Sequence, residues 1–276
     1  MTRLDHARNA YEAMAPFYDD FTADHRYEEW TRTIESLAHD AGLRGRRLLD
    51  VACGTGKSFL PFLERGYEVT ACDISPAMAS AARAKARGRA RVSVQDMRQL
   101  PSLGTFDLIC CLDDAVNYLH SAREVCAAFA AMARNLAPAG VMVFDANTLL
   151  AYRTFFATLS VIQREGQVLI WDGATPPDLS AGGLARATLE AYTAAEEGWA
   201  RTRSRHVQRH HPEAHVRTWL AAAGLEPVAV HGLQQDGSLS VAVDELVDTK
   251  ALYVVRRDQA QRPGTGEPAA GTAAVA

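Results

Sequence analysis

The sequence predicts an α/β fold in which helices cover a doubly wound, mostly parallel sheet of seven strands. Through residue 148, short apolar runs alternate with segments of helical character, which is the pattern of parallel strands joined by crossover helices. Beyond residue 148 the alternation stops, and short β-like runs follow one another with turns between them. We therefore expect an N-terminal helical segment, a parallel core, and an antiparallel β insertion within that core.

The first predicted strand leads into a turn with two glycines, Asp50-Val51-Ala52-Cys53-Gly54-Thr55-Gly56, and then into a helical segment. Glycine lets the backbone approach a ligand closely, and the first amides of the next helix point into the same crevice. A dinucleotide fingerprint would need glycine at position 59, which is Phe59, and a phosphate-binding loop would need it at Val51. We interpret Lys57-Ser58, after the turn, as a coincidental match to that loop.

The second predicted strand, residues 68–72, ends at Asp73, which stands 19 residues after Gly54. An acid about 20 residues beyond such a turn reaches a ribose diol, because a carboxylate accepts hydrogen bonds from both hydroxyl groups. Ser75 suits the N-cap of the following helix and Pro76 its first position. The spacing therefore predicts a nucleoside pocket between Gly54 and Asp73.

The N-terminal segment, residues 7–40, predicts one or two helices, the first of them broken by Pro16. This segment gathers six aromatic residues: Tyr11, Phe17, Tyr18, Phe21, Tyr27 and Trp30.

Three further strands are predicted at residues 91–94, 106–112 and 141–145, with a helix over 121–137. Ligands of open parallel sheets bind outside the carboxyl ends of the strands. We therefore expect the segments that follow these strands, at 95–97, 113–118 and 146–148, to face the site. Asp107 precedes its strand rather than ending it, so we expect it to be structural.

The insertion is predicted as a helix at 149–158 and strands near 161–163, 168–171, 185–192 and 199–208. A helix at 212–224 and strands at 227–231 and 252–256 follow. We expect four parts: a helical lid (1–42), a core (43–150 and 210–257), an acceptor-side insertion (151–209) and a disordered tail (258–276).

Composition narrows the possible partners. A net charge of −4 argues against a protein that binds many phosphates of a nucleic acid. No run of 18 apolar residues is present, we expect no signal peptide, and five cysteines (Cys53, Cys72, Cys110, Cys111, Cys126) form no C-x-x-C pattern. We expect a cytoplasmic monomer or homodimer with no membrane or nucleic-acid partner.

Taken in order, the glycine turn, Asp73 and the segments at 95–97, 113–118 and 145–148 resemble the class I S-adenosylmethionine-dependent methyltransferases of small molecules, including sugar N-methyltransferases of antibiotic pathways. Ala52 replaces the first glycine of the D-x-G-x-G-x-G motif, as in its form D-x-A-C-G-T-G. The resemblance covers roughly residues 7–150. It implies a Rossmann-like fold with S-adenosyl-L-methionine as the cofactor and S-adenosyl-L-homocysteine as its product.

The resemblance also implies roles for residues. Asp73 would hold the ribose, Asp96 the adenine amine, and Met97 would cover the ring, while N-terminal aromatics close over the cofactor. The cofactor residues expected are Tyr11, Tyr18, Trp30, Asp50, Ala52, Cys53, Gly54, Gly56, Asp73, Ile74, Asp96, Met97 and Leu112.

On the acceptor side we expect Tyr118, Asn147 and His206 to carry the catalytic work. His206 belongs to a cluster with His210, His211 and His215. We expect no metal there, because Pro212 interrupts the spacing and no H-x-x-x-H pair on one helix has an adjacent carboxylate. Instead His206 or His210 is a candidate general base, since histidine titrates near neutral pH.

The predicted function is in-line methyl transfer to a nitrogen, oxygen or carbon atom of a small molecule, in bacterial secondary metabolism. A protein of this fold that binds the cofactor but has lost catalysis, or runs a cyclase-like reaction, is the alternative. A nucleic-acid methyltransferase is the weaker third hypothesis. A run of alternating arginines would instead suit an anionic small molecule: Arg201, Arg203, Arg205 and Arg209.

Overall fold

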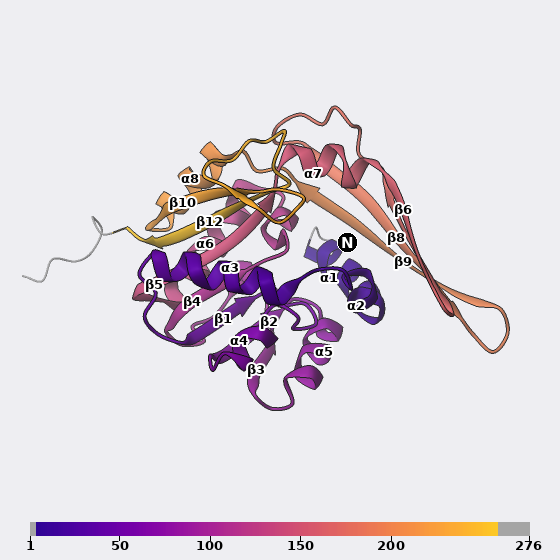
Figure 1. Cartoon of the computed structure of the whole chain (residues 1–276), viewed down its shortest axis with the longest axis horizontal. Coiled ribbons are helices and arrows are strands. Elements are labelled where there is room, and N and C mark those ends of the chain that lie inside the picture. Colours follow the sequence, from indigo (N-terminus) through magenta and orange to yellow (C-terminus); the bar gives the residue numbers. More distant parts are fainter. Residues whose placement is uncertain (1–3, 259–276) are drawn as a thin grey trace, which may run out of the picture.

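The computed structural model describes residues 4–258 and contains two sheets (Figure 1). The larger sheet has eight strands, in the spatial order β11 (Leu239–Ser240), β10 (Leu225–Leu233), β12 (Lys250–Arg257), β5 (Leu136–Asn147), β4 (Phe106–Cys111), β1 (Arg47–Val51), β2 (Glu68–Asp73) and β3 (Ala90–Val94). The smaller sheet has the order β6 (Leu159–Arg164), β7 (Gln167–Gly173), β8 (Leu184–Ala194) and β9 (Trp199–Arg209). Beyond Asp258, the tail predicted to be disordered lies outside the described residues.

The predicted fold class is confirmed. Strands β1 to β5 pair in parallel, and β12 runs antiparallel between β5 and β10. The large sheet has eight strands rather than seven, because β11 adds two residues to the end of β10. So short a pairing has no hydrophobic period that a sequence could show. The predicted division into four parts stays a prediction.

The helices of the core connect its strands or cover the sheet: α1 (Leu4–Met14), α2 (Tyr18–Phe21), α3 (Tyr27–Asp40), α4 (Leu60–Glu64), α5 (Pro76–Ala86), α6 (Ala122–Asn135), α7 (Leu149–Arg153) and α8 (Glu213–Ala222). The expected helix break is confirmed, since α1 ends at Met14 and a 3₁₀ turn carries Pro16. Ser75 caps α5, its side chain accepting a hydrogen bond from the amide of Met78.

One boundary differs from the prediction. The strand predicted at 141–145 begins earlier in the structure: helix α6 ends at Asn135 and β5 begins at the next residue, so Pro138 and Gly140 lie inside a long strand. The early part of β5 pairs Leu136 with Phe106 before a register shift. A proline at such an irregular strand end removes no ladder bond that the sheet needs.

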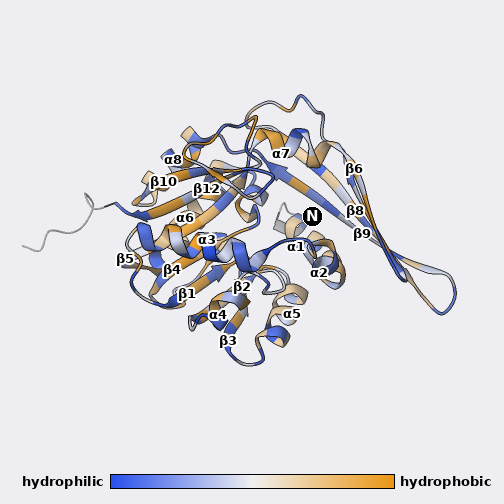
Figure 2. Cartoon of the chain, viewed as in Figure 1, coloured by the Kyte–Doolittle hydropathy of each residue, from blue (hydrophilic) through white to orange (hydrophobic). Residues whose placement is uncertain are grey.

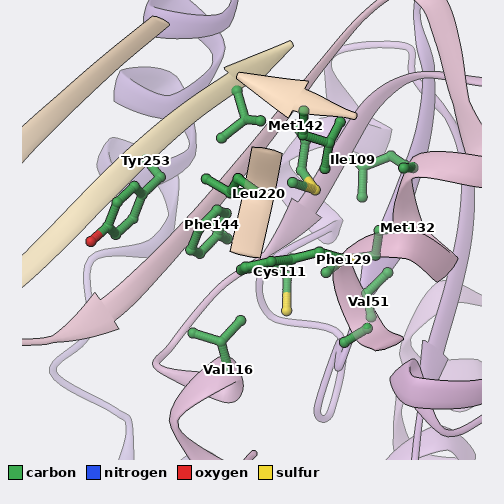
Figure 3. Packing of buried hydrophobic residues seen from close by; sticks show 14 of the residues in the cluster. Val51, Ile109, Cys111, Val116, Phe129, Met132, Met142, Phe144, Leu220 and Tyr253 are labelled. Carbon is green, nitrogen blue, oxygen red and sulfur yellow. The ribbon is translucent and has the colours of Figure 1, made fainter. Parts of the chain in front are cut away.

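The core lies on both faces of the large sheet. On one face the rings of Phe144 and Tyr253 stack with centroids 4.6 Å apart, and Phe129 packs against Phe144 from α6 (Figure 3). Figure 2 shows hydrophobic residues along the central strands, whereas the helices carry both hydrophobic and hydrophilic residues. Asp107 accepts a hydrogen bond from the amide of Arg47 (2.9 Å) at the start of β4, which confirms its structural role.

The four-stranded sheet extends away from the large sheet, and α1 packs against β9 beneath it (Figure 1). Alternate residues of β9 face opposite sides: Ser204, His206 and Gln208 are buried, whereas the arginines at 201, 203 and 205 are exposed. Among residues 4–258, no helix is long and apolar enough to cross a bilayer.

Candidate active site

The turn after β1 adopts backbone angles that favour small residues. Gly54 and Gly56 have φ values of +54° and +90°, and Ala52 has φ of +60°. A Cβ at Gly56 would come within 2.8 Å of the Phe59 ring, so this position requires glycine. Ala52 accepts the left-handed conformation that a glycine would adopt without strain. The turn therefore passes its backbone close to the carboxyl end of β2.

Asp73 lies at that end and is held by backbone amides. One carboxylate oxygen accepts from the amide of Gly54 (2.9 Å) and the other from the amide of Ser75 (2.8 Å). Burial raises the pKa of Asp73 to about 6. The carboxylate is thereby fixed between the glycine turn and the start of α5, which is where the spacing placed it.

Ala52 borders two small crevices, one on each side of the turn. The first is formed by Ile74, Asp96, Met97 and residues of the segment after β4 that include Tyr118. Asp96 is paired there with the guanidinium of Arg98 (2.7 Å), which also contacts Glu124 (3.0 Å). A flat apolar group with a polar edge, such as an adenine, fits a crevice lined this way.

The second crevice is formed by Tyr18, Tyr27, Cys53, Lys57 and residues that include Leu112 and Asp113. Beside it, Asp50 is buried, with one carboxylate oxygen accepting from the hydroxyl of Ser58 (2.6 Å). The other oxygen has no partner among the described residues, and burial raises the pKa of Asp50 to about 7. An unpartnered buried carboxylate oxygen is satisfied by a cationic donor.

The N-terminal segment is tied across these crevices. Glu12 accepts hydrogen bonds from the hydroxyl of Ser75 (2.7 Å) and the amide of Ala77 (3.1 Å) at the start of α5. Asp19 accepts from Thr55 (2.6 Å) and pairs with Lys85.

Lys57 has a local partner rather than a phosphate-loop geometry. Its ammonium donates to the carbonyl of Thr22 (2.7 Å), so it joins the glycine turn to the N-terminal segment.

A larger cavity of about 280 Å³ lies next to both crevices. Tyr118 borders this cavity and the first crevice, while Tyr18 and Asp113 border the cavity and the second crevice. One wall is aromatic. Trp171 stacks on Phe155 (4.7 Å between centroids) and contacts Phe156 and Phe21 edge-on or tilted. We call this space the aromatic cavity.

The structure brings all three expected catalytic residues to the aromatic cavity. The hydroxyl of Tyr118 lies 2.8 Å from Nδ1 of His206, and the other ring nitrogen lies 2.9 Å from the hydroxyl of Ser204. Burial lowers the pKa of His206 to about 4, so the ring is neutral at neutral pH. The side-chain amide of Asn147 donates to the side-chain oxygen of Gln208 (3.0 Å), and Gln208 in turn donates to Asp114. Asn147 is thus linked to the acidic residues through Gln208.

Acidic residues also border the aromatic cavity. Asp113 and Asp114 both have left-handed backbone angles, φ of +57° and +54°, and their amides donate to the buried carboxylate of Asp145. Lys250 lies 3.0 Å from Asp114 and 3.4 Å from Asp145. Burial opposes the charge of Lys250, yet the three carboxylates raise its pKa. Three acids therefore share one ammonium group.

Burial raises the pKa of Asp145 to about 6, although Lys250 acts in the other direction. Asp113 and Asp114 are consecutive non-glycine residues with left-handed backbone angles, so the surrounding contacts must hold this strained segment in place.

The expected cofactor residues do not all lie together. Tyr11 borders the aromatic cavity, its ring 5.2 Å from that of Tyr118 and 5.7 Å from that of His206. Trp30 lies in a separate groove beside α3. The other expected cofactor residues surround the turn, Asp73 and the two crevices.

The remaining histidines make local structural contacts. His210 is buried 3.0 Å from Glu245 and accepts the amide of Gly182 (3.1 Å), and His211 contacts the carbonyl of Val116 (3.3 Å). No group of three or more potential ligands within residues 4–258 is placed to hold a metal ion.

The arginines of β9 point away from His206. Arg201 and Arg203 pair with Glu190 on the exposed face of the small sheet, and they border none of the cavities described above. These arginines are therefore not placed to hold an anionic acceptor in the aromatic cavity.

The sequence prediction missed several cavity residues: Gln208, Lys250, Trp171, Phe155 and Phe156. Gln208 could have been found, because it follows His206 by two residues on one strand and must share its face. Lys250 opens an apolar strand and carried no such signal.

Comparison with known proteins agrees with this geometry. A family model described as a methyltransferase domain matches residues 48–140, from β1 into β5. The Bacillus subtilis protein YqeM, whose name places it among the methyltransferases, is 32% identical over 174 residues, which cover 61% of this chain and 68% of YqeM.

Two further proteins are similar over much of the chain. A Streptomyces venezuelae protein named dTDP-3-amino-3,4,6-trideoxy-alpha-D-glucopyranose N,N-dimethyltransferase is 30% identical over 145 residues, 52% of this chain and 58% of that protein. The crystal structure of an S-adenosylmethionine-dependent methyltransferase from Clostridium acetobutylicum superposes with a TM-score of 0.75 at 23% identity, covering 90% of this chain and 98% of the other. With the glycine turn, Asp73 and the parallel sheet, these matches show that the chain belongs to the class I S-adenosylmethionine-dependent methyltransferases.

Proposed function

We propose that this methyltransferase transfers a methyl group to an amine nitrogen of a small molecule held in the aromatic cavity. S-adenosylmethionine, when bound, supplies an electrophilic methyl group on a sulfonium sulfur. The two crevices suit the two ends of this cofactor, and the aromatic cavity adjoins both through Tyr18, Asp113 and Tyr118. An acceptor in the aromatic cavity would therefore lie beside the sulfonium.

The residues around the glycine turn fit the cofactor. We propose that Asp73 binds the ribose hydroxyls and that Met97 and Ile74 cover the adenine, with Asp96 at its amine. Asp50 and the second crevice would take the methionine end, because the unpartnered oxygen of Asp50 suits an ammonium group. The N-terminal segment, tied down through Glu12, Asp19 and Lys57, would close over the bound cofactor.

The carboxylates of Asp113 and Asp114 are the reason for proposing nitrogen as the acceptor atom. Methyl transfer to an amine breaks the carbon–sulfur bond, forms a carbon–nitrogen bond and moves the positive charge onto nitrogen. Fixed carboxylates beside the acceptor stabilise that charge as it develops. Transfer to a hydroxyl needs a base to remove its proton, and His206, with a pKa near 4, is a weak one at neutral pH.

Tyr118 and His206 are assigned a positioning role at the acceptor. If His206 accepts the Tyr118 hydroxyl proton in a hydrogen bond, the phenol oxygen is free to accept an N–H of the acceptor. This orients the nitrogen lone pair for in-line attack. Asn147 acts one step away, through Gln208, which donates to Asp114. The Streptomyces venezuelae relative, by its name, also methylates nitrogen.

The test is transfer of a labelled methyl group to matched acceptors, for example benzylamine against benzyl alcohol and cyclohexylmethylamine against cyclohexylmethanol. We expect label in the amines and a lower rate in Asp114→Asn, with binding of S-adenosylhomocysteine unchanged by calorimetry. Preferential label in the alcohols would overturn the choice of nitrogen. Cofactor binding without transfer to any amine would favour the alternative, a protein of this fold that does not methylate. Oligomeric state and a place in secondary metabolism stay predictions.

A further inference from the structure

A second cavity of about 500 Å³ opens beside the aromatic cavity. It lies between the start of α3 and the turn at Leu233–Gly237 that follows β10, a loop that Figure 1 draws in yellow-orange above α3. Trp30 forms part of its wall. We call this space the outer groove. Apart from Trp30, none of the expected cofactor residues borders it, and it shares only Tyr27 and Asp113 with the second crevice.

The outer groove and the aromatic cavity adjoin one another. Both are bordered by the same five residues: His25, Asp113, Gln235, Thr249 and Lys250. These residues come from the N-terminal segment, the end of β4, the turn after β10 and the start of β12. A molecule whose reactive group lies in the aromatic cavity can therefore extend past Lys250 into the outer groove.

The outer groove is acidic. Four carboxylates border it, from Asp24, Glu29, Asp113 and Asp236, against two cations, Arg26 and Lys250. Both cations are already paired, since Arg26 contacts Glu29, and Lys250 is shared by Asp113, Asp114 and Asp145. Asp24 makes no ion pair with any residue in the described part of the chain. Burial lowers the pKa of His25, so it adds no charge at neutral pH.

We infer that the outer groove is a second subsite for the acceptor and that it takes a cationic group without phosphate. This inference rests on the proposed amine methylation and extends it: the acceptor is a two-part molecule with amines in both parts. A nucleoside diphosphate, by contrast, would place two phosphates against four carboxylates with no free cation to receive them. On this point the chain departs from the nucleotide-sugar relative named above.

The test uses two probes that each contain an amino sugar. Kanamycin A carries several amines and no phosphate, and UDP-glucosamine carries one amine on a nucleoside diphosphate. Binding of each is measured by calorimetry at low ionic strength, with S-adenosylhomocysteine present, because exposed charges are screened by salt. The variant Asp24→Lys/Asp236→Lys reverses two exposed charges of the outer groove. Its control, Asp172→Lys/Glu226→Lys, makes the same change in net charge at exposed residues that border neither cavity.

We expect the wild type to bind kanamycin A more tightly than UDP-glucosamine. The affinity for kanamycin A should fall about five-fold or more in the groove variant and change little in the control. Each exposed ion pair contributes under about 1 kcal/mol, and the groove variant reverses two charges. Tighter binding of UDP-glucosamine, no binding of kanamycin A, or equal loss in both variants would overturn the subsite. Failure of the proposed function is distinguishable, because it shows as absent methyl transfer to benzylamine while the charge dependence of kanamycin A binding persists.

Discussion

The hydroxyl of Tyr118 lies 2.8 Å from Nδ1 of His206, although 88 residues separate them in the chain. Tyr118 follows β4 in the parallel sheet, and His206 stands on β9 of the antiparallel sheet. The contact therefore joins the two sheets at the place where the first crevice meets the aromatic cavity.

Tyr118→Phe tests this contact. Loss of the hydroxyl removes the hydrogen bond to His206 and the proposed one to the acceptor, so we expect kcat to fall roughly 10- to 100-fold. The affinity for S-adenosylhomocysteine should change little. Steady-state rates at saturating benzylamine give kcat, and calorimetry gives the affinity.

Tyr192→Phe is the matched control for that change, because Tyr192 bonds Glu190 on the exposed face of the small sheet. An equal loss of rate in both variants, or an unchanged kcat in Tyr118→Phe, would contradict the positioning role.

Asp73 is expected to determine cofactor affinity. Asp73→Ala removes the carboxylate proposed to bind the ribose and also the acceptor for the amides of Gly54 and Ser75. Charge-assisted hydrogen bonds contribute about 1.5–3 kcal/mol each, so the Kd for S-adenosylmethionine should rise about 10- to 100-fold. Calorimetric titration measures it.

Asp107→Asn serves as the control, since Asp107 also accepts a backbone amide but lies at the opposite end of its strand. If it weakened cofactor binding as much as Asp73→Ala, the loss would reflect general destabilisation instead of ribose contact.

The cluster around Lys250 is expected to be important for stability. Asp145→Ala would leave the amides of Asp113 and Asp114 without their acceptor and would remove one partner of Lys250. Breaking one side of a buried charged cluster costs about 3 kcal/mol, so the free energy of unfolding should fall by about that amount. Denaturant titration measures the loss.

The double variant Asp145→Ala/Lys250→Met separates the two contributions. Partial recovery would assign much of the loss to the unpaired ammonium group. Equal instability of the single and double variants would assign it to the two amides instead. A stability within 0.5 kcal/mol (about the range of surface changes) for Asp145→Ala would contradict the role of the cluster.

Residues next to each predicted strand end could be predicted because spacing along the chain is enough to place them. The glycine turn, Asp73 and Ser75 follow from spacing along one βαβ unit, and their contacts lie within a few residues of a known strand end. His206 was predicted from its chemistry, and β9 then places it beside Tyr118.

The aromatic wall and the acids around Lys250 could not be predicted in the same way. Trp171 and Phe155 meet because β7 runs back past the turn at residues 155–157, and Lys250 meets Asp145 through the antiparallel pairing of β12 with β5. Both depend on which strands become neighbours, which hydrophobic period alone does not encode. Trp30 likewise carried aromatic character but no sign that it would border the outer groove.

His206 makes the stability of the protein depend on acid pH in a defined window. Burial lowers its pKa from the ordinary 6.5 to about 4, so the folded state binds its proton later than the unfolded state does. Its contribution to stability is present above pH 6.5 and is lost as the pH falls toward 4.

The variant His206→Gln removes this titration. The difference in unfolding free energy between wild type and variant should therefore shift against the wild type by on the order of 2 kcal/mol between pH 7 and pH 4. Denaturant titrations of both proteins at several pH values measure it, and His215→Gln, a histidine near the start of α8, is the control. A difference that stays constant across this window would show that His206 titrates normally and is accessible to protons, which would restore it as a candidate base and weaken the argument for a nitrogen acceptor.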